Sequence, residues 1–489
     1  MSALHQEDRE RVLRDLSQMG ASGQAERESP EDFRRRFYPV AEHSRALEPD
    51  VVLIVGERGA GKSELFRAVV QENLLAPIVR FSPNSRLARL DLDKTRWLEG
   101  HPLGQEFPDN TGLRRFIEQR GDDSEAIMDL WFAYLARVLG TELSGVTDVT
   151  SVPGGDSEGV MSAFQRLGNR PLLALDKLDK KLEAEERWCF VSYDELDTLG
   201  GYDWNAMACL IRGLISFWAS YSRRWNRVRA KIFLRTDLFR RYGQILGADL
   251  IKLASNRAEI VWSDRNLYAM LVKRIANTSD LLKKYSVDSR LSFDTDPLLG
   301  SVPRLSRAED ARPLIERMVG PYMGADIKKG RSFTWLLNHV RDGNGRAMPR
   351  ALVRLIEEGA TQEIHAPRAT HSRLLDPRSL RRALDKVSEE HVLQVHTNEL
   401  PWLPGVANRL RGEEVPMLRR DAEKRLAKEW DKRWGQKPEV RPPVDSPAAL
   451  MDYLVDLGVL RVRAGSRIDA PDLFLAGLGL KRKGGVVKR

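Results

Sequence analysis

The sequence contains only two cysteines in 489 residues, Cys189 and Cys209. Both lie in apolar surroundings without a His or Cys at metal-ligand spacing, which predicts buried thiols rather than a disulfide or a metal site. Long hydrophobic runs are also missing. No apolar stretch reaches the ~18 residues that span a bilayer, and the first residues show no charged-then-apolar secretion pattern. We therefore expect a cytoplasmic location without membrane contact.

The excess of basic over acidic residues lies towards the C-terminus. Residues 367–489 hold 25 Lys and Arg against 17 Asp and Glu, and this surplus of 8 makes up most of the net charge of +9. Such an excess suggests contact with DNA or another polyanion, and a solvated basic surface explains it equally well. The length predicts two or three domains, and the 42% hydrophobic content is enough to fill their cores.

The most informative segment is a glycine-rich loop at residues 56–63. It follows the apolar run 51–55 and precedes a helical stretch at 64–70, the order of a phosphate-binding P-loop. Glycines allow backbone angles closed to other residues, so that successive N–H groups converge on nucleotide phosphates. We expect Lys62 to reach the outer phosphates and the Ser63 hydroxyl to bind Mg²⁺. The expected nucleotide-binding residues are Gly56, Glu57, Arg58, Gly59, Ala60, Gly61, Lys62 and Ser63.

A second motif consists of the hydrophobic strand 188–193 followed by two acids, Asp194 and Glu195. Ligands of parallel α/β sheets gather beyond the carboxyl ends of the strands, which predicts Asp194 beside the loop. We expect Asp194 to hold Mg²⁺ together with Ser63. Glu195 is the candidate that polarises the water attacking the γ-phosphate, because this step needs an ionised carboxylate within hydrogen-bond reach.

Later strand ends supply candidate arginines. A third core strand ends at Arg235 and Thr236, the candidates for sensing the γ-phosphate; the alternative for Arg235 is a structural ion pair with Asp237 or Asp194. Arg257 precedes a further strand at 258–262 and is a candidate for action in trans, on the phosphate bound by a neighbouring subunit.

Basic and aromatic residues interleave at 218–229. The arginines there are Arg223, Arg224, Arg227 and Arg229, and the aromatic residues are Trp218, Tyr221 and Trp225. This pattern fits either a nucleic-acid grip or the solvated face of an amphipathic helix, and we favour the helix.

The order of elements predicts an α/β fold: a P-loop NTPase parallel sheet with helices on both faces, a helical lid and a C-terminal winged-helix-like domain. The expected parts are a polar N-terminal arm at 1–30, a P-loop ATPase core at 31–275 with a helical insertion at about 83–170, a helical lid at 276–370 and a basic C-terminal region at 371–489. Residues 77–81 are expected to form a second strand.

Within the C-terminal region, helices are expected at 379–395 and 414–434. A helix followed by a hairpin, within about 446–489, looks like the latter half of a winged helix.

The motifs GERGAGKS (56–63), YDELD (193–197) and FLRTD (233–237), in this order, resemble the AAA+/STAND branch of P-loop ATPases. Together with 342–350, they are most similar to a poorly characterised group of bacterial P-loop ATPases. The resemblance implies a helical lid with a second sensor arginine, for which Arg350 is the match, and it implies oligomers in which Arg257 would act in trans.

These features predict an enzyme, a Mg²⁺-dependent ATPase that acts as a switch or assembly factor and controls a partner protein or a DNA contact. ATP is favoured over GTP because no guanine-reading N-K-x-D stretch is evident. The expected partners are further copies of the chain or an effector protein, with a DNA contact through the basic C-terminal region.

Two alternative functions remain. One is a DNA-binding loader or initiator whose assembly ATP controls. The other is a bacterial anti-invader (phage-defence) ATPase component, which would need a separate effector because no nuclease, protease or deaminase constellation is visible.

Overall fold

The computed structural model describes residues 6–20, 28–121, 123–140, 142–143, 147–201, 203–243, 253–366, 373–398, 400–432, 434–435 and 440–483. The chain forms two compact units. The sheet unit is Pro39–Val261, and the helical unit combines Met1–Tyr38 with Trp262–Arg489. The four-part division expected from the sequence stays a prediction.

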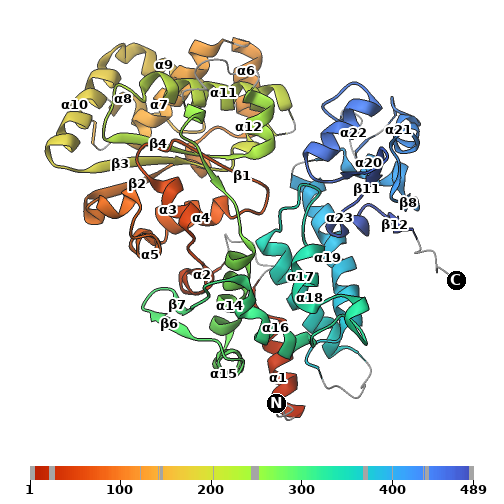
Figure 1. The fold of residues 1–489 in the computed structure, drawn as a ribbon. Coiled ribbons are helices and arrows are strands. Elements are labelled where there is room, and N and C mark those ends of the chain that lie inside the picture. Colours follow the sequence, from red (N-terminus) through yellow and green to blue (C-terminus); the bar gives the residue numbers. More distant parts are fainter. Residues whose placement is uncertain are drawn as a thin grey trace. The chain divides into compact units, whose positions relative to one another are not determined.

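A five-stranded parallel sheet forms the centre of the sheet unit (Figure 1). Its strand order is β2-β3-β4-β1-β5. The strands are β1 (Leu53–Gly56), β2 (Thr95–His101), β3 (Trp188–Tyr193), β4 (Val228–Arg235) and β5 (Ala258–Ile260). All residues of β1 are buried, as expected for a parallel strand covered on both faces.

Helices cover both faces of this sheet (Figure 1). On one face lie α3 (Ala41–Leu47), α4 (Lys62–Val70) and α5 (Leu75–Arg80). On the other face lie α6 (Asn110–Arg120), α7 (Ser124–Val138), α8 (Thr147–Thr150), α9 (Ser157–Leu167), α10 (Arg170–Ala184) and α11 (Trp204–Tyr221). Helix α12 (Thr236–Gly243) follows β4 directly. The predicted α/β class with helices on both faces is confirmed.

Two local predictions in the sheet unit are wrong. Residues 77–81 belong mostly to helix α5, because an apolar run of five residues fits either state and periodicity alone does not separate them. The missing strand is β2, which lies inside the stretch expected to be a helical insertion. It is the edge strand and is only partly buried, so its sequence lacks a continuous apolar run.

The basic and aromatic residues of 218–229 are not the solvated face of one helix, because α11 ends at Tyr221 and β4 begins at Val228. Trp218 and Trp225 are buried. Tyr221 stacks on Trp225 with 4.9 Å between the ring centroids. The Arg224 guanidinium pairs with Asp176 at 2.6 Å. These groups therefore pack the core and its rim rather than offering free ring faces to a nucleic acid.

The helical unit begins with α1, which buries Val12, Leu13 and Leu16 within the stretch expected to be a polar arm. A hairpin of β6 (Phe293–Asp296) and β7 (Gly300–Pro303) packs on helix α14 (Asp264–Thr278). The helices up to residue 398 are α1 (Gln6–Leu16), α2 (Pro30–Arg36), α14 (Asp264–Thr278), α15 (Asp280–Asp288), α16 (Arg312–Val319), α17 (Ser332–His339), α18 (Pro349–Ile364) and α19 (Pro377–Asn398).

The C-terminal part has the element order of a winged helix. Helix α20, strand β9, helices α21 and α22, and strands β10 and β11 follow one another, and the three strands form an antiparallel sheet in the order β10-β11-β9. The bounds are α20 (Leu403–Leu410), β8 (Glu414–Val415), β9 (Met417–Leu418), α21 (Arg419–Ala427), α22 (Pro447–Asp456), β10 (Arg461–Arg463), β11 (Arg467–Asp469), α23 (Asp472–Leu475) and β12 (Lys481–Arg482).

This arrangement corrects the expected helix at 414–434, which is a helix only from Arg419 to Ala427. Two very short strands precede it, and such strands give almost no periodic signal. The final basic residues at 484–489 lie outside the described residues. In the described part of the chain, no helix has both the length and the apolar character to cross a membrane.

Candidate nucleotide-binding site

The loop between β1 and α4 requires glycine for two different reasons. Gly59 and Gly61 have φ angles of 70° and 89°, in the left-handed region that is costly for residues with a Cβ atom. Gly56 is restricted by packing instead, because a Cβ atom there would lie 3.2 Å from Cβ of Ala60. The loop thus folds back tightly on itself before α4 begins.

The expected phosphate-binding residues lie together at this turn. Lys62 and Ser63 open α4, so that they occupy the positive end of the helix dipole. The Lys62 ammonium donates to the carbonyl oxygens of Gly56 and Glu57, at 2.9 Å and 3.1 Å. The lysine is thereby folded over its own loop.

The structure places the Ser63 hydroxyl near the Asp194 carboxyl. The Ser63 hydroxyl and the main-chain amide of Glu195 act on this carboxyl as hydrogen-bond donors that favour its ionised form. Burial is the largest influence on Asp194 and raises its pKa, while these two donors and the charge of Lys62 act to lower it. A serine hydroxyl and a carboxylate facing one another are oxygen ligands of the kind that Mg²⁺ prefers.

The strand order refines how this pair forms. Strand β4 lies between β1, which carries the loop, and β3, which carries Asp194. The acid is therefore two strands away from the loop strand. Sequence alone predicted that the two motifs meet, but it did not predict the intervening strand.

Glu195 has an uncommon backbone conformation. Its φ and ψ angles are 55° and 25°, in the left-handed region. For a residue with a side chain this conformation costs about 1–2 kcal/mol, and it persists only where the surroundings enforce it. Glu195 is half-buried and begins a short 3-10 turn, η5 (Leu196–Thr198).

The two sensor candidates at the end of β4 differ sharply. Arg235 is bound to Asp237 through two hydrogen bonds of 2.9 Å and 2.8 Å, and it also reaches Asp197 at 3.3 Å. The ion pair considered as an alternative is therefore present. Burial alone would raise the pKa of Asp237, but the charges of Arg235 and Lys62 lower it.

Unlike Arg235, Thr236 has a side chain without a bonded partner among the described residues. Its side chain is 5% exposed, and its hydroxyl has no hydrogen-bond partner among the described residues. A buried hydroxyl without a partner is uncommon in proteins and is often explained by a ligand or water molecule.

Arg257 lies away from this cluster within the sheet unit, and Arg350 belongs to the other unit. Arg257 precedes β5, whose first residue Ala258 is level with Ile54, so the arginine lies towards the amino ends of the strands, whereas Gly56 lies at the carboxyl end of the neighbouring strand β1. Its guanidinium donates to the Ala254 carbonyl oxygen at 3.1 Å. Arg350 is exposed near the start of α18 in the helical unit.

Sequence reasoning missed two residues of the site. Asp197 was part of a recognised motif, but its role as a partner of Arg235 was not predicted. His101 gave no signal, because it ends an edge strand that was not predicted. Among the described residues, no group of three or more His, Cys, Asp or Glu side chains is placed to hold a metal ion.

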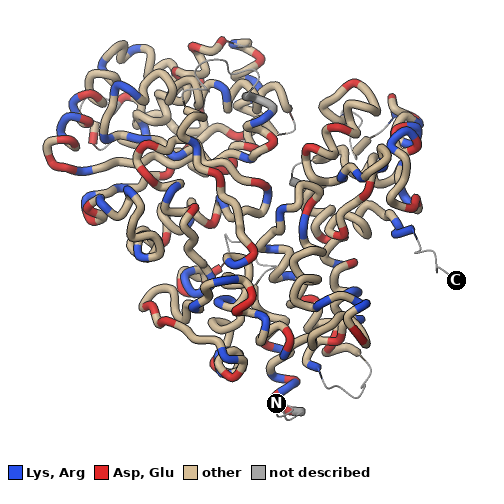
Figure 2. Tube along the Cα trace, viewed as in Figure 1, with Lys and Arg blue, Asp and Glu red and all other residues tan. Residues whose placement is uncertain are grey.

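The surface expected to contact DNA has a mixed charge (Figure 2). Helix α22, which follows α21 in the manner of a recognition helix, contains no Lys or Arg. Its exposed side includes Asp452 and Asp456. Exposed cations lie on α21 instead, at Arg420 and Lys424, and directly after it at Lys428.

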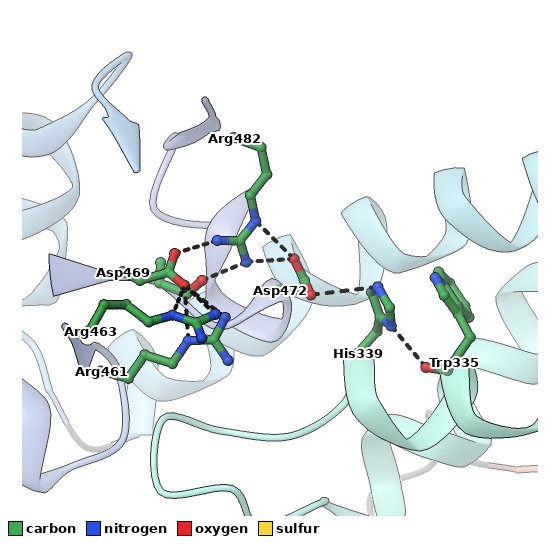
Figure 3. Close-up of polar contacts among 8 residues, drawn as sticks. Trp335, His339, Arg461, Arg463, Asp469, Asp472 and Arg482 are labelled. Atoms are coloured by element: carbon green, nitrogen blue, oxygen red, sulfur yellow. Dashed lines mark hydrogen bonds and ion pairs between the residues drawn. The ribbon is translucent and has the colours of Figure 1, made fainter. Parts of the chain in front are cut away.

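The arginines of β10 and β12 are held by one buried acid, Asp469 (Figure 3). Arg461 donates to its carboxylate at 2.7 Å, and Arg463 and Arg482 also pair with it. Burial would raise the pKa of Asp469, but the three guanidinium groups lower it. Arg482 further pairs with Asp472 at 2.7 Å, so these arginines connect strands within the domain.

No protein-family model matches the chain, and no curated protein matches it in sequence. Among solved structures, the chain is similar to the Aeropyrum pernix ORC2 protein. The structure of its ADPNP–ADP complexes is 14% identical, with a TM-score of 0.38 over 88% of this chain and 86% of that chain. The ADP form is 13% identical, with a TM-score of 0.31 over 96% of this chain and 90% of that chain. At this level of similarity, the function of the chain has to be inferred from its own site.

Proposed function

We propose that this chain is a Mg²⁺-dependent ATPase whose nucleotide state controls a partner protein or a DNA contact. The observation that carries the proposal is the placement of the Ser63 hydroxyl and the Lys62 ammonium near the Asp194 carboxyl, beyond the ends of β1 and β3 of one parallel sheet. These groups come from two separate motifs and meet at the carboxyl edge of a parallel sheet, the usual place for a ligand in such folds.

The residues fit a nucleotide with its metal ion. The amides of the loop and the N-terminus of α4 would bind phosphate oxygens, and Lys62 would turn from the loop carbonyls to the outer phosphates. Ser63 and Asp194 would hold Mg²⁺, which neutralises charge between phosphates. Because protein carboxylates usually supply only one or two Mg²⁺ ligands, with phosphates and waters completing the set, a site with a single carboxylate is sufficient.

Glu195 would polarise the attacking water, since it follows Asp194 directly and its backbone conformation is held in place. Thr236 is the better candidate for sensing the γ-phosphate, because its buried hydroxyl has no partner in the described part of the chain. Arg235 would have to leave Asp237 and Asp197 to reach a phosphate. We assign ATP rather than GTP because the chain has no evident N-K-x-D stretch.

The helical unit offers a way for a nucleotide to act on the C-terminal domain. The segment 342–346, which leads into α18 and Arg350, is hydrogen-bonded to the end of α22. If Arg350 senses the nucleotide as the second sensor, a displacement of α18 would therefore move the winged-helix-like part with it. A winged-helix-like part that moves with the nucleotide state would suit a switch that acts on an effector protein or on further copies of the chain. An ATPase component of an anti-invader system would be one such switch.

A second candidate function is a DNA-binding loader or initiator with ATP-controlled assembly. The winged-helix order of elements favours it, and the exposed cations of α21 could contact phosphates. In that case the affinity of the native chain for duplex DNA should fall steeply as the salt concentration rises. At any one salt concentration, a Lys424→Glu, Lys428→Glu variant should bind the duplex more weakly than the native chain. An Asp456→Lys variant should bind no more tightly than the native chain, because α22 would not face the DNA. Absence of salt-sensitive binding would exclude this function.

The ATPase proposal is tested with three variants, Lys62→Ala, Glu195→Gln and, as a control, Arg115→Ala on the exposed face of α6. Binding of a fluorescent ATP analogue and release of phosphate are measured with and without Mg²⁺. Lys62→Ala should weaken binding at least about tenfold, because charged hydrogen bonds are lost. Glu195→Gln should bind normally but lose about a hundredfold or more in turnover. Turnover at the native rate by Glu195→Gln would remove the catalytic assignment.

A further inference from the structure

The main chain around Asp194 is held from both sides by one residue of β2, His101. The amide of Asp194 donates to the His101 carbonyl oxygen at 2.9 Å. The Nδ1 atom of the His101 ring lies 2.8 Å from the Asp194 carbonyl oxygen. Because a carbonyl oxygen can only accept, Nδ1 carries the hydrogen and donates it. Backbone and side chain of His101 thus bind the N–H and the C=O of the same residue.

This double contact lies where the sheet can no longer fix the chain. His101 is level with Tyr193, the last residue of β3, so Asp194 is the first residue beyond the paired strands. The Asp194 carbonyl oxygen belongs to the peptide that joins Asp194 to Glu195. Rotation of this peptide changes ψ of Asp194 and φ of Glu195, and the observed φ of 55° is one that a free chain avoids.

His101 is itself held firmly. It is 5% exposed, and its ring meets Phe107 and Trp131 edge to face, with centroids 5.0 Å and 6.3 Å away. Trp131 is fixed in turn through a 2.9 Å hydrogen bond from its indole nitrogen to the Leu210 carbonyl oxygen. A rigid aromatic layer therefore stands behind the ring.

We propose that His101 is a positioning residue of the site, which fixes the Asp194–Glu195 peptide and thereby directs the Glu195 carboxylate. It acts through the main chain and does not touch the nucleotide. The inference rests on the proposed ATPase function, and it assigns a task to a residue outside the loop and acid motifs. Outer partners that orient functional groups in this way commonly contribute 10–100-fold to activity.

The matched pair His101→Asn and His101→Gln tests this role. The Asn amide nitrogen lies near the position of Nδ1 and can still donate to the Asp194 carbonyl oxygen, whereas the Gln amide nitrogen lies near the position of Nε2 and points elsewhere. We expect His101→Gln to lower kcat at least tenfold while KM for ATP and the affinity for a slowly hydrolysed analogue stay within about twofold. His101→Asn should keep most of the native kcat.

Phe107→Leu is the packing control, because it loosens the ring environment without removing the hydrogen bond. It should lower thermal stability and leave kcat near the native value. Native kcat in His101→Gln, or equal losses in the Asn and Gln variants, would overturn the proposal. So would a parallel loss of kcat and nucleotide affinity that Phe107→Leu reproduces. Absence of nucleotide binding and turnover in the native chain would instead refute the ATPase function itself.

Discussion

The main-chain amide of Gly343 donates a 2.7 Å hydrogen bond to the carbonyl oxygen of Gly458. The bond joins the segment before α18 to the turn after α22. The Asn344 side chain adds a second bond to this turn, from its amide nitrogen to the Asp456 carbonyl oxygen at 3.1 Å. The helix that carries Arg350 and the winged-helix-like part are therefore tied together by backbone contacts, which leave little room for independent movement.

A Gly343→Ala variant should break this tie. The added Cβ atom would lie 2.3 Å from the Leu460 carbonyl oxygen, so one of the two backbones has to move. We expect faster amide hydrogen exchange in 342–346 and 456–460, and a loss of stability of about 2 kcal/mol from the broken bond and the displacement.

Gly345→Ala in the same segment is the matched control. Gly345 has a φ of 79° but open space around its Cα, so the variant suffers local strain without a clash. Amide hydrogen exchange at 456–460 in this variant should stay at the native rate. Equal exchange rates at 456–460 in both variants would show that the close approach of Gly343 to Leu460 does not hold the segment 342–346 against the turn after α22.

A Thr236→Val variant should separate stability from activity. The Thr236 hydroxyl is buried without a hydrogen-bond partner among the described residues, so replacing it with a methyl group removes an unsatisfied polar atom. We expect the free energy of unfolding to stay level or to rise by about 1 kcal/mol, while kcat falls at least tenfold. Thr236→Ser should keep the native kcat. A variant that lost stability as well would indicate that the hydroxyl supports the fold.

The loop at 56–63 and the acids at 194 and 195 were predictable because each requirement is local. Left-handed turns need Gly59 and Gly61, and a strand followed by two acids stands out in a single sequence. The order of the strands was not predictable, since pairing of distant segments leaves no trace in local periodicity. For the same reason the Arg235 pair with Asp197, from the end of another strand, could not be chosen in advance over a pair with Asp194.

Edge and short elements were the ones missed. Strand β2 alternates polar and apolar residues only loosely, and β9 is two residues long, so neither shows the sequence periodicity of a strand. With β2 hidden, His101 could not be placed next to Asp194. The first half of the winged-helix arrangement was missed for the same reason, because it includes the unrecognised strand β9.

Acid should destabilise the sheet unit through His43. Burial lowers the pKa of His43 from 6.5 to about 4, although the nearby charge of Glu64 acts to raise it. The unfolded chain then binds the proton first, so this contribution to stability is complete above about pH 6.5 and is lost as the pH falls towards 4. Over this pH range, the contribution of His43 to the free energy of unfolding changes by about 3 kcal/mol.

A His43→Asn variant removes the titration. Its side-chain oxygen can replace Nδ1 as the acceptor for the Val40 amide, which lies 3.3 Å from that nitrogen in the native chain. Denaturant unfolding at pH 7.5, 6 and 5 should show a smaller loss of stability in the variant than in the native chain. Identical pH slopes would mean that His43 is protonated in the folded state without cost.

Two inactive variants should restore turnover when mixed, if Arg257 acts in trans. Arg257 lies towards the amino ends of the strands, about 10 Å along the strand direction from Gly56 at the carboxyl end of β1, so it is badly placed to serve its own nucleotide. Arg257→Ala keeps an intact site, and Glu195→Gln keeps the arginine. In mixed oligomers, the arginine of a Glu195→Gln subunit can complete the site of an Arg257→Ala subunit.

Phosphate release from the mixture should exceed the sum of the release from the two separate samples. A Glu195→Gln, Arg257→Ala double variant, mixed with the Arg257→Ala variant in place of Glu195→Gln, should not restore phosphate release. Strict additivity, together with an elution volume that a slowly hydrolysed ATP analogue does not change, would contradict action in trans.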